Sequence, residues 1–300
     1  MNEIIGKEYP LKNIFSKDFD FVIPPYQRPY SWTIEHVGQL FDDLYDFMVT
    51  QDENETYFLG SIVLIKDKNQ TCAEVIDGQQ RLISLTILLA AITSQLGDGQ
   101  AQSMAKYVNE PGDEAEDIKP KPRLTLKPKD KDYFKKYIQD FNFNELYEIN
   151  AQSLTDSQRN IIENAKFIQT KLNELLKGDR IKIFDFGKFI VNRCYIVAVS
   201  TSSMKSAYRI FSILNDRGLD LLDSDILKAD IVGRISEENR ENYTKKWEDL
   251  EDEIGRKYFN DLFGYMRMIL LKRKLKKTIL DELKEFLINE KFNPEKFMDN

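Results

Sequence analysis

Histidine is almost missing from this chain of 300 residues, which has only His36. A Ser-His-Asp triad, a two-histidine zinc site or a histidine-dependent nuclease would have to use that residue or be absent. His36 lies at the expected start of a helix, so we interpret it as a surface residue. The two cysteines, without CxxC spacing, exclude a disulfide framework and a cysteine-rich zinc site, and they fit a reducing cytoplasm.

Long apolar runs are missing as well. No stretch of about 18 apolar residues occurs and the N-terminus has no signal-peptide core, so we expect a cytoplasmic protein without membrane spans. The net charge of −7 predicts no attraction of the whole molecule to nucleic acid, which would need a local basic patch. A hydrophobic content of 42% with 31% charged residues is ordinary for a globular protein. The length allows one large core or two domains.

The string Asp-Gly-Gln-Gln-Arg at residues 77–81 lies where a β-hairpin gives way to a long helix. Apolar periodicity predicts strands at 57–66 and 72–76 and a helix at 79–96. Gly78 permits a sharp turn and the close approach of a ligand. The first-turn N–H groups, the helix dipole and Arg81 then favour an anion, phosphate above all. The alternative is an N-cap by Asp77 followed by a surface arginine.

A proline-rich segment precedes this region. Three prolines within residues 24–29 forbid a helix and impose an extended or turning path. Such a rigid segment can line a pocket with its aromatic and polar side chains, which are Tyr26, Gln27, Arg28, Tyr30 and Trp32. The alternative is a connection whose aromatic rings pack on the core.

A third string spans residues 211–230. Its Asn-Asp-Arg-Gly sequence at 215–218 predicts the end of a helix, and Asp223 is the expected N-cap of the next one. One interpretation is a plain helix–cap–helix connection. The other is that three side chains point at the same phosphate-bearing pocket as Arg81, namely Asn215, Arg217 and Lys228. The spacing alone does not decide between them.

Other segments complete the expected organisation. Thr33 is the expected N-cap of an amphipathic helix that ends near Thr50, and residues 194–200 form the best strand of the second half. Two basic runs, at 119–136 and 266–277, are interpreted as solvated charged faces, with patches for nucleic acid or a partner as the alternative. We expect the run at 266–277 to be helical throughout.

These three strings, in this order, resemble the GmrSD N-terminal domain family (domain of unknown function 262), over about residues 10–235. The resemblance implies an α+β fold with a small ParB/sulfiredoxin-like mixed core and an added helical region. We expect that core at 1–110, a linker or insertion at 111–128, and a mostly helical domain at 129–300 that returns residues 192–230 to the site.

The resemblance also implies an NTP-binding and NTP-hydrolysing module of a bacterial phage-defence restriction system, some members of which act on modified DNA. Carried onto this chain, Gly78 and the N–H groups of Gln79 and Gln80 would cradle phosphate. Arg81 would neutralise it, with Arg28 reaching in from the proline-rich segment.

The cofactors implied are a nucleoside triphosphate and Mg²⁺. Asp77 is the expected Mg²⁺ ligand, or it orients the attacking water, so the expected catalytic residues are Asp77, Gln80 and Arg81. The aromatic residues expected to stack on the base or to close the pocket are Tyr26, Tyr30 and Trp32.

Many members of the family continue into an HNH nuclease domain with metal-binding histidines, which this chain does not contain. We therefore expect a separate nuclease domain or partner protein to cut modified DNA, and we leave self-association open. Two alternatives remain at this point. One is a nucleotide switch without hydrolysis that licenses a partner nuclease, and the other is a ParB-like DNA-binding or nicking module whose phosphate site grips the DNA backbone.

Overall fold

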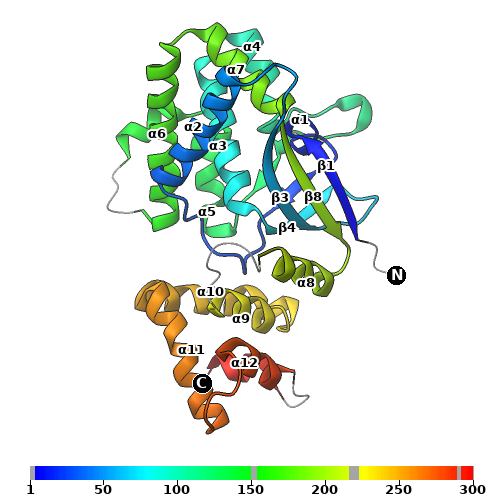
Figure 1. Ribbon diagram of the computed structural model, residues 1–300, viewed down its shortest axis with the longest axis vertical. Coiled ribbons are helices and arrows are strands. Elements are labelled where there is room, and N and C mark those ends of the chain that lie inside the picture. The colour runs from blue at the N-terminus through cyan, green and yellow to red at the C-terminus, as the bar shows by residue number, and fades with distance from the viewer. Residues whose placement is uncertain (1–3, 150–153, 216–222, 289–291, 300) are drawn as a thin grey trace. The chain divides into compact units, whose positions relative to one another are not determined.

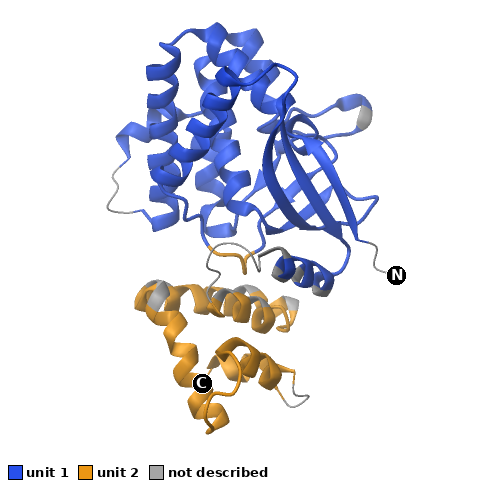
Figure 2. Ribbon diagram, in the orientation of Figure 1, with its two compact units in different colours: residues 1–24, 29–216 blue, residues 25–28, 217–300 orange. Residues whose placement is uncertain are grey.

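The computed structural model describes residues 4–149, 154–215, 223–288 and 292–299. The chain forms two compact units (Figure 2). Unit 1 holds residues 1–24 and 29–216, and unit 2 holds residues 25–28 and 217–300. Across the described ranges, every helix is too short or too polar to cross a lipid bilayer.

Unit 1 is built on a mixed six-stranded sheet with the order β1-β8-β3-β4-β2-β7 (Figure 1). Its strands are β1 Ile5–Pro10, β2 Asp20–Val22, β3 Tyr57–Ile65, β4 Cys72–Asp77, β7 Leu124–Thr125 and β8 Cys194–Thr201. A separate pair consists of β5 Asn109–Glu110 and β6 Lys121–Pro122. The predicted hairpin and the predicted strand at 194–200 are confirmed, and with the helices they make the α+β fold that we expected.

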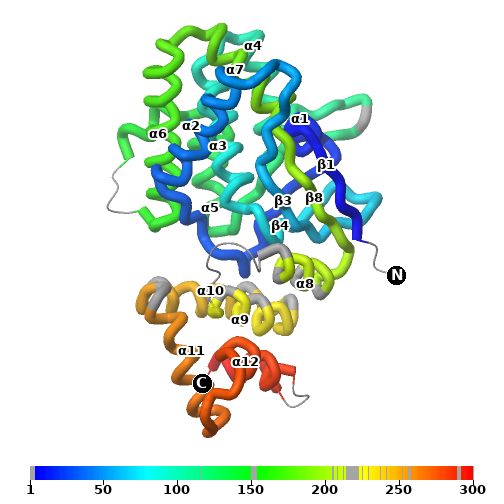
Figure 3. Tube along the Cα trace, viewed as in Figure 1, coloured from blue at the N-terminus to red at the C-terminus, as the bar shows by residue number. Residues whose placement is uncertain are grey.

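The centre of the sheet joins segments far apart in the sequence. β3 pairs antiparallel with β4 and parallel with β8, so that Val63 lies opposite both Asp77 and Val199. Figure 3 shows the trace of β8 running beside that of β3. Parallel neighbours need a long crossover connection, and here the whole helical half of unit 1 provides it.

Helices fill the rest of unit 1. They are α1 Leu11–Ile14, α2 Ile34–Thr50, α3 Gln79–Gln95, α4 Asp98–Ala105, α5 Pro128–Phe134, α6 Asp156–Leu176, α7 Arg180–Arg193 and α8 Met204–Asn215. Shorter turns are the 3₁₀ segments Glu114–Glu116 and Phe143–Glu148 and the π segment Lys135–Gln139. The predicted helix with Thr33 as its N-cap is α2, and it ends at Thr50 as expected.

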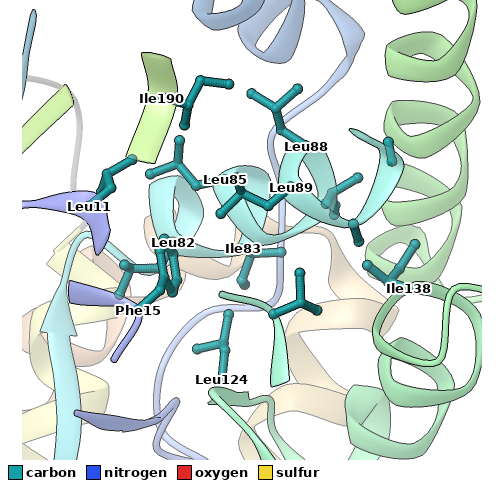
Figure 4. Packing of buried hydrophobic residues seen from close by; sticks show 14 of the residues in the cluster. Leu11, Phe15, Leu82, Ile83, Leu85, Leu88, Leu89, Leu124, Ile138 and Ile190 are labelled. Atoms are coloured by element: carbon teal, nitrogen blue, oxygen red, sulfur yellow. The ribbon is translucent and has the colours of Figure 1, made fainter. Parts of the chain in front are cut away.

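The helix α3 is buried on all sides. Its residues from Leu82 to Thr93 are all buried, in contact with α4, α6, α7 and β7. Figure 4 shows Leu82, Ile83, Leu85 and Leu88 from this helix among the side chains of the main core cluster. Each fully buried leucine or isoleucine contributes about 1.5 to 3 kcal/mol. The position of the first turn of α3 is therefore fixed by the core behind it.

Residues 111–128, which we interpreted as a linker or insertion, lie within unit 1. β7 pairs parallel with β2, and Arg123 just before it is buried with Nη1 at 2.8 Å from Glu110. In the basic run that begins here, Lys121 pairs with Asp20 at 2.6 Å. These contacts give the segment a structural role in the sheet.

Unit 2 is helical in its described part, with a core of its own around Leu227, Trp247 and Phe263. Its helices are α9 Asp223–Val232, α10 Glu237–Ile254, α11 Arg256–Leu271, α12 Ile279–Leu287 and α13 Pro294–Asp299. The expectation of a helix through 266–277 is wrong in its second half, because α11 ends at Leu271 and Lys272 adopts a left-handed conformation with φ of 46°. A run of five basic residues in six would place like charges one turn apart on a helix, which disfavours its continuation.

Candidate functional site

The turn between β4 and α3 requires glycine. Gly78 has φ of +90°, and a Cβ at this position would lie 2.4 Å from Cγ2 of Ile62 on β3. The residue is also the N-cap of α3, so the alternative that Asp77 caps the helix is wrong. A glycine cap has no side-chain acceptor for the first-turn N–H groups, which leaves them to a ligand or to water.

Arg81, one turn into α3, lies against β3. Its Nη1 donates a hydrogen bond to the carbonyl of Ser61 at 2.9 Å. The guanidinium lies over Gly60, which has φ of +94°, and a Cβ there would meet Nη2 at 3.2 Å. The pairing of β3 with β8 shifts register between Phe58 and Ser61, around this glycine. The irregularity in β3 therefore makes room for the arginine, which is half-buried and not on the open surface.

The positive charge of Arg81 persists in this setting. Burial lowers the pKa of its guanidinium, while the Asp77 carboxylate and the Tyr57 phenol act in the opposite direction. An arginine pKa starts so high that a lowered value still leaves the side chain charged at neutral pH. The fold thus holds the guanidinium of Arg81 near the side-chain carboxylate of Asp77, at the positive end of the α3 dipole.

The two glutamines of the string differ sharply. Both are buried, but Gln80 is fully engaged: its Oε1 accepts from the backbone N–H groups of Ser31 and Trp32 at 2.8 and 3.1 Å, and its Nε2 donates to the carbonyl of Pro29 at 3.2 Å. Gln80 therefore fixes the end of the proline-rich segment. The Oε1 atom of Gln79 is buried without a hydrogen-bond partner among the described residues, although Gln79 is only 5% exposed.

Asn164 of α6 is a site residue that the sequence analysis missed. It is fully buried, and its Nδ2 donates to the carbonyl of Trp32 at 2.7 Å and to the Tyr30 hydroxyl at 2.9 Å. The same hydroxyl lies 2.7 Å from Oγ of Ser84 on α3, and burial raises the pKa of Tyr30. A signal for it existed, since Asn164 interrupts the apolar stripe of Ile161 and Ala165 and a polar residue in a buried stripe needs partners.

His36 is exposed on the first turn of α2, as the sequence predicted. Its Nδ1 accepts from the backbone N–H of Thr33 at 3.3 Å and completes a capping box there. The ring stacks on Trp32 with centroids 5.9 Å apart. The one histidine of the chain thus has a role at a helix start and beside the proline-rich segment.

The structure brings only some of the predicted residues together. Unit 1 contains the string 77–81 and, hydrogen-bonded to it, the segment from Pro29 to Trp32. The other predicted ligands fall elsewhere: Tyr26, Gln27 and Arg28 group with unit 2, Asn215 ends α8 with its side chain outside the description, and Arg217 lies outside the described residues. Lys228 of α9 is buried in unit 2, with Nζ 3.1 Å from Glu248. Their convergence on one pocket stays a prediction.

The metal-binding capacity of the site is modest. Within the described ranges, no three His, Cys, Asp or Glu residues gather as a metal-binding group. Mg²⁺ needs less, because it commonly takes one or two carboxylates and completes its octahedron with water and substrate phosphate oxygens. Asp77 ends β4 beside the α3 turn, and its binding of such an ion stays a prediction.

The model of the GmrSD restriction endonuclease N-terminal domain family matches residues 11–232, about three quarters of the chain. The chain belongs to this family. No curated protein matches it.

As a GmrSD N-terminal domain, the protein is a component of a phage-restriction system. The family match runs from α1 to the end of α9 and includes the string 77–81, Asn164 and Lys228. The helices α10 to α13 of unit 2 lie beyond it.

Proposed function

We propose that unit 1 binds the phosphates of a nucleoside triphosphate at the first turn of α3 and hydrolyses it with Mg²⁺, in support of a nuclease domain or partner that cuts modified DNA. The observation that carries the proposal is the buried Oε1 of Gln79, unpartnered among the described residues, beside a turn whose glycine leaves no room for a side chain. An unsatisfied buried polar atom costs about 1 to 3 kcal/mol, and a ligand at this turn offsets that cost.

The residues present fit such a ligand. The side-chain amide of Gln79 offers an acceptor, or after a 180° rotation its NH₂ group, to the ligand. The N-terminal N–H groups of α3 and the guanidinium of Arg81 supply donors and positive charge for phosphate. Asp77 would hold Mg²⁺ together with phosphate oxygens, and the ion when bound neutralises charge on the phosphates.

The roles of the remaining residues follow from their contacts. Gln80 and Asn164 position the segment from Pro29 to Trp32. The hydrogen bonds that the structure describes for their side-chain amides all go to residues of this segment. In hydrolysis, a water oxygen bonds to the terminal phosphorus while the bond to the diphosphate oxygen breaks, and a carboxylate such as Asp77 can orient that water. Tyr30 and Trp32 belong to this segment. Tyr30 is buried, and Trp32 is half-buried with one face stacked on His36, which leaves its other face for a base.

The first test removes the cation. Arg81→Ala is expected to weaken binding of Mg-nucleotide by about 1.5 to 3 kcal/mol, the scale of a charge-assisted hydrogen bond. Calorimetric titration with a slowly hydrolysed triphosphate analogue measures this, with circular dichroism to confirm the fold. Arg180→Ala is the matched control, because Arg180 is exposed on the first turn of α7 and should leave the affinity unchanged. Unchanged affinity in a folded Arg81→Ala protein would refute the phosphate site.

The second test separates turnover from binding. Asp77→Asn keeps the shape of the side chain and removes its charge, so we expect phosphate release to fall by about a hundredfold while nucleotide affinity changes by less than tenfold. A phosphate-release assay with Mg²⁺ and a titration of the same preparation measure the two quantities. Binding without phosphate release in the unaltered protein would favour the nucleotide switch, and full turnover in Asp77→Asn would remove Asp77 from the mechanism.

A further inference from the structure

Helix α11 of unit 2 carries apolar residues on two faces. Phe259 and Phe263 are buried in the core of unit 2, where α11 contacts α9, α10 and α12. Figure 1 shows α9 and α12 to one side of α11. A second set is turned away from that core: Tyr258 is 70% exposed, Tyr265 61% and Ile269 69%.

These exposed residues form a regular row. Together with the half-buried Leu262 they occupy positions i, i+4, i+7 and i+11, which lie on one line along a helix. We name this row the α11 stripe. The spacing is that of a coiled-coil seam, in which the apolar side chains of one helix pack against those of another helix. Isolated exposed apolar residues are common, but three of them in heptad register with Leu262, which also packs against the core of unit 2, indicate an interaction surface.

The stripe has a symmetry of its own. The steps between its members are four, three and four residues, so the pattern is the same when the helix is reversed. In an antiparallel pair of α11 helices, Tyr258 of one copy would face Ile269 of the other, and Leu262 would face Tyr265. A two-fold axis between the helices makes the interface isologous, the usual geometry of homodimers.

Charges at the two ends favour the same arrangement. Residues 249–261, which cover the end of α10 and the beginning of α11, contain five acidic and two basic residues, and Asp249, Glu253 and Asp261 among them are exposed. Residues 272–277, just past the end of the stripe, contain five basic residues and no acidic one. Arg273 and Lys277 pair with Glu282 and Glu285 of α12, and Lys274 is exposed. Parallel copies would bring like charges together, whereas antiparallel copies place the acidic end of one beside the basic end of the other.

We infer that the α11 stripe is a homodimerisation surface, on which a second copy of this chain docks its own α11 in the antiparallel direction. The inference does not depend on the nucleotide site, which lies in unit 1, and the stripe lies outside the part of the chain that the family model matches. Two helices of this length bury a small area, so we expect a dimer with a dissociation constant in the micromolar range.

The first experiment measures self-association of the 300-residue chain by sedimentation equilibrium at about 1 to 100 µM, a range that brackets such a constant. Ile269→Glu is expected to weaken the dimer at least about tenfold, because it places a charge in the seam. The matched control is Ile181→Glu, since Ile181 is 67% exposed in unit 1 and lies outside the stripe. Both positions are exposed, so neither substitution should unfold the protein.

The second experiment tests the antiparallel direction. Glu253 lies at the end of α10, just before the acidic end of α11, and Lys274 lies just past its basic end. An antiparallel pair of α11 helices would bring Glu253 of one copy near Lys274 of the other. Glu253→Lys and Lys274→Glu should each weaken the dimer about three- to tenfold at low salt, and the two together in one chain should restore it. A parallel pair would show no such rescue.

A monomer at every concentration would overturn the inference, as would equal losses in Ile269→Glu and Ile181→Glu. A protein that stays monomeric, binds DNA and loses that binding in Ile269→Glu would also overturn the inference. The stripe would then be assigned to nucleic acid. A concentration-dependent dimer that fails in Ile269→Glu and recovers in the charge-swapped chain would establish it.

Discussion

Replacing Gly78 by alanine is expected to lower the free energy of unfolding of unit 1 by about 3 kcal/mol, the sum of left-handed backbone strain and overpacking. The φ of +90° at this position disfavours any residue with a Cβ, and that atom would lie 2.4 Å from Cγ2 of Ile62. Neither β3 nor α3 can retreat cheaply, because both are packed into the main core cluster. Nucleotide binding should be lost together with stability, since the same turn forms the proposed phosphate site.

Urea denaturation followed by circular dichroism measures the loss for Gly78→Ala. The control is Gly99→Ala in α4, where a Cβ would meet nothing within 4 Å and where alanine favours the helix. The control should be neutral or slightly stabilising. A loss below about 1 kcal/mol in Gly78→Ala would show that the turn relaxes freely, against the geometry described above.

Asn164→Leu is the second substitution for which we expect a large effect, about 2 to 3 kcal/mol of unfolding free energy. Leucine has a similar volume, so the loss would come from polar groups left without a donor. The carbonyl of Trp32 would lose a 2.7 Å hydrogen bond, and the buried hydroxyl of Tyr30 would keep only Ser84. We also expect faster hydrogen exchange at residues 30–32, because one of the three side-chain amides that hold this segment would be gone, leaving those of Gln80 and Asn160.

The control for this substitution lies on the same helix. Asn173 is exposed on α6, and Asn173→Leu makes the same chemical change without burying or unpairing anything. It should shift the unfolding free energy by no more than about 0.5 kcal/mol. Equal effects of the two substitutions would mean that the Asn164 hydrogen bonds contribute nothing beyond those of a surface amide.

The parts of the fold that depend on residues close together in the sequence were predictable from the sequence. Apolar periodicity located α2, the hairpin of β3 and β4, α3 and β8, and Thr33 marked the start of α2 as an N-cap. Each of these signals acts over one or two helical turns or along one strand. The turn at Gly78 was predictable for the same reason, since a glycine between a strand and a helix is a local signal.

The contacts that complete the site were not predictable in the same way. Asn164 meets Tyr30 across 134 positions, and nothing near either residue specifies the other. Gly60 gave a local hint of an irregular strand, but its pairing with Arg81 depends on how β3 and α3 pack. The sequence also did not show that residues 111–128 belong to unit 1. The strand β7 that ties them to the sheet has only two residues, and it pairs Leu124 with the distant Phe21 of β2. Pairings of this range are set by the tertiary fold and not by local propensity.

The place of β8 in the sheet bears on how the protein is made. β3 is finished long before β8 leaves the ribosome, and until then one edge of this nine-residue strand has no neighbour. Its apolar sequence from Ile62 to Ile65 is the kind that pairs with other exposed strands, so the nascent chain depends on the early helices, or on chaperones, to cover it. A chain released at residue 110 would keep that edge open, and expression of such a fragment should give aggregates where the intact unit stays dispersed.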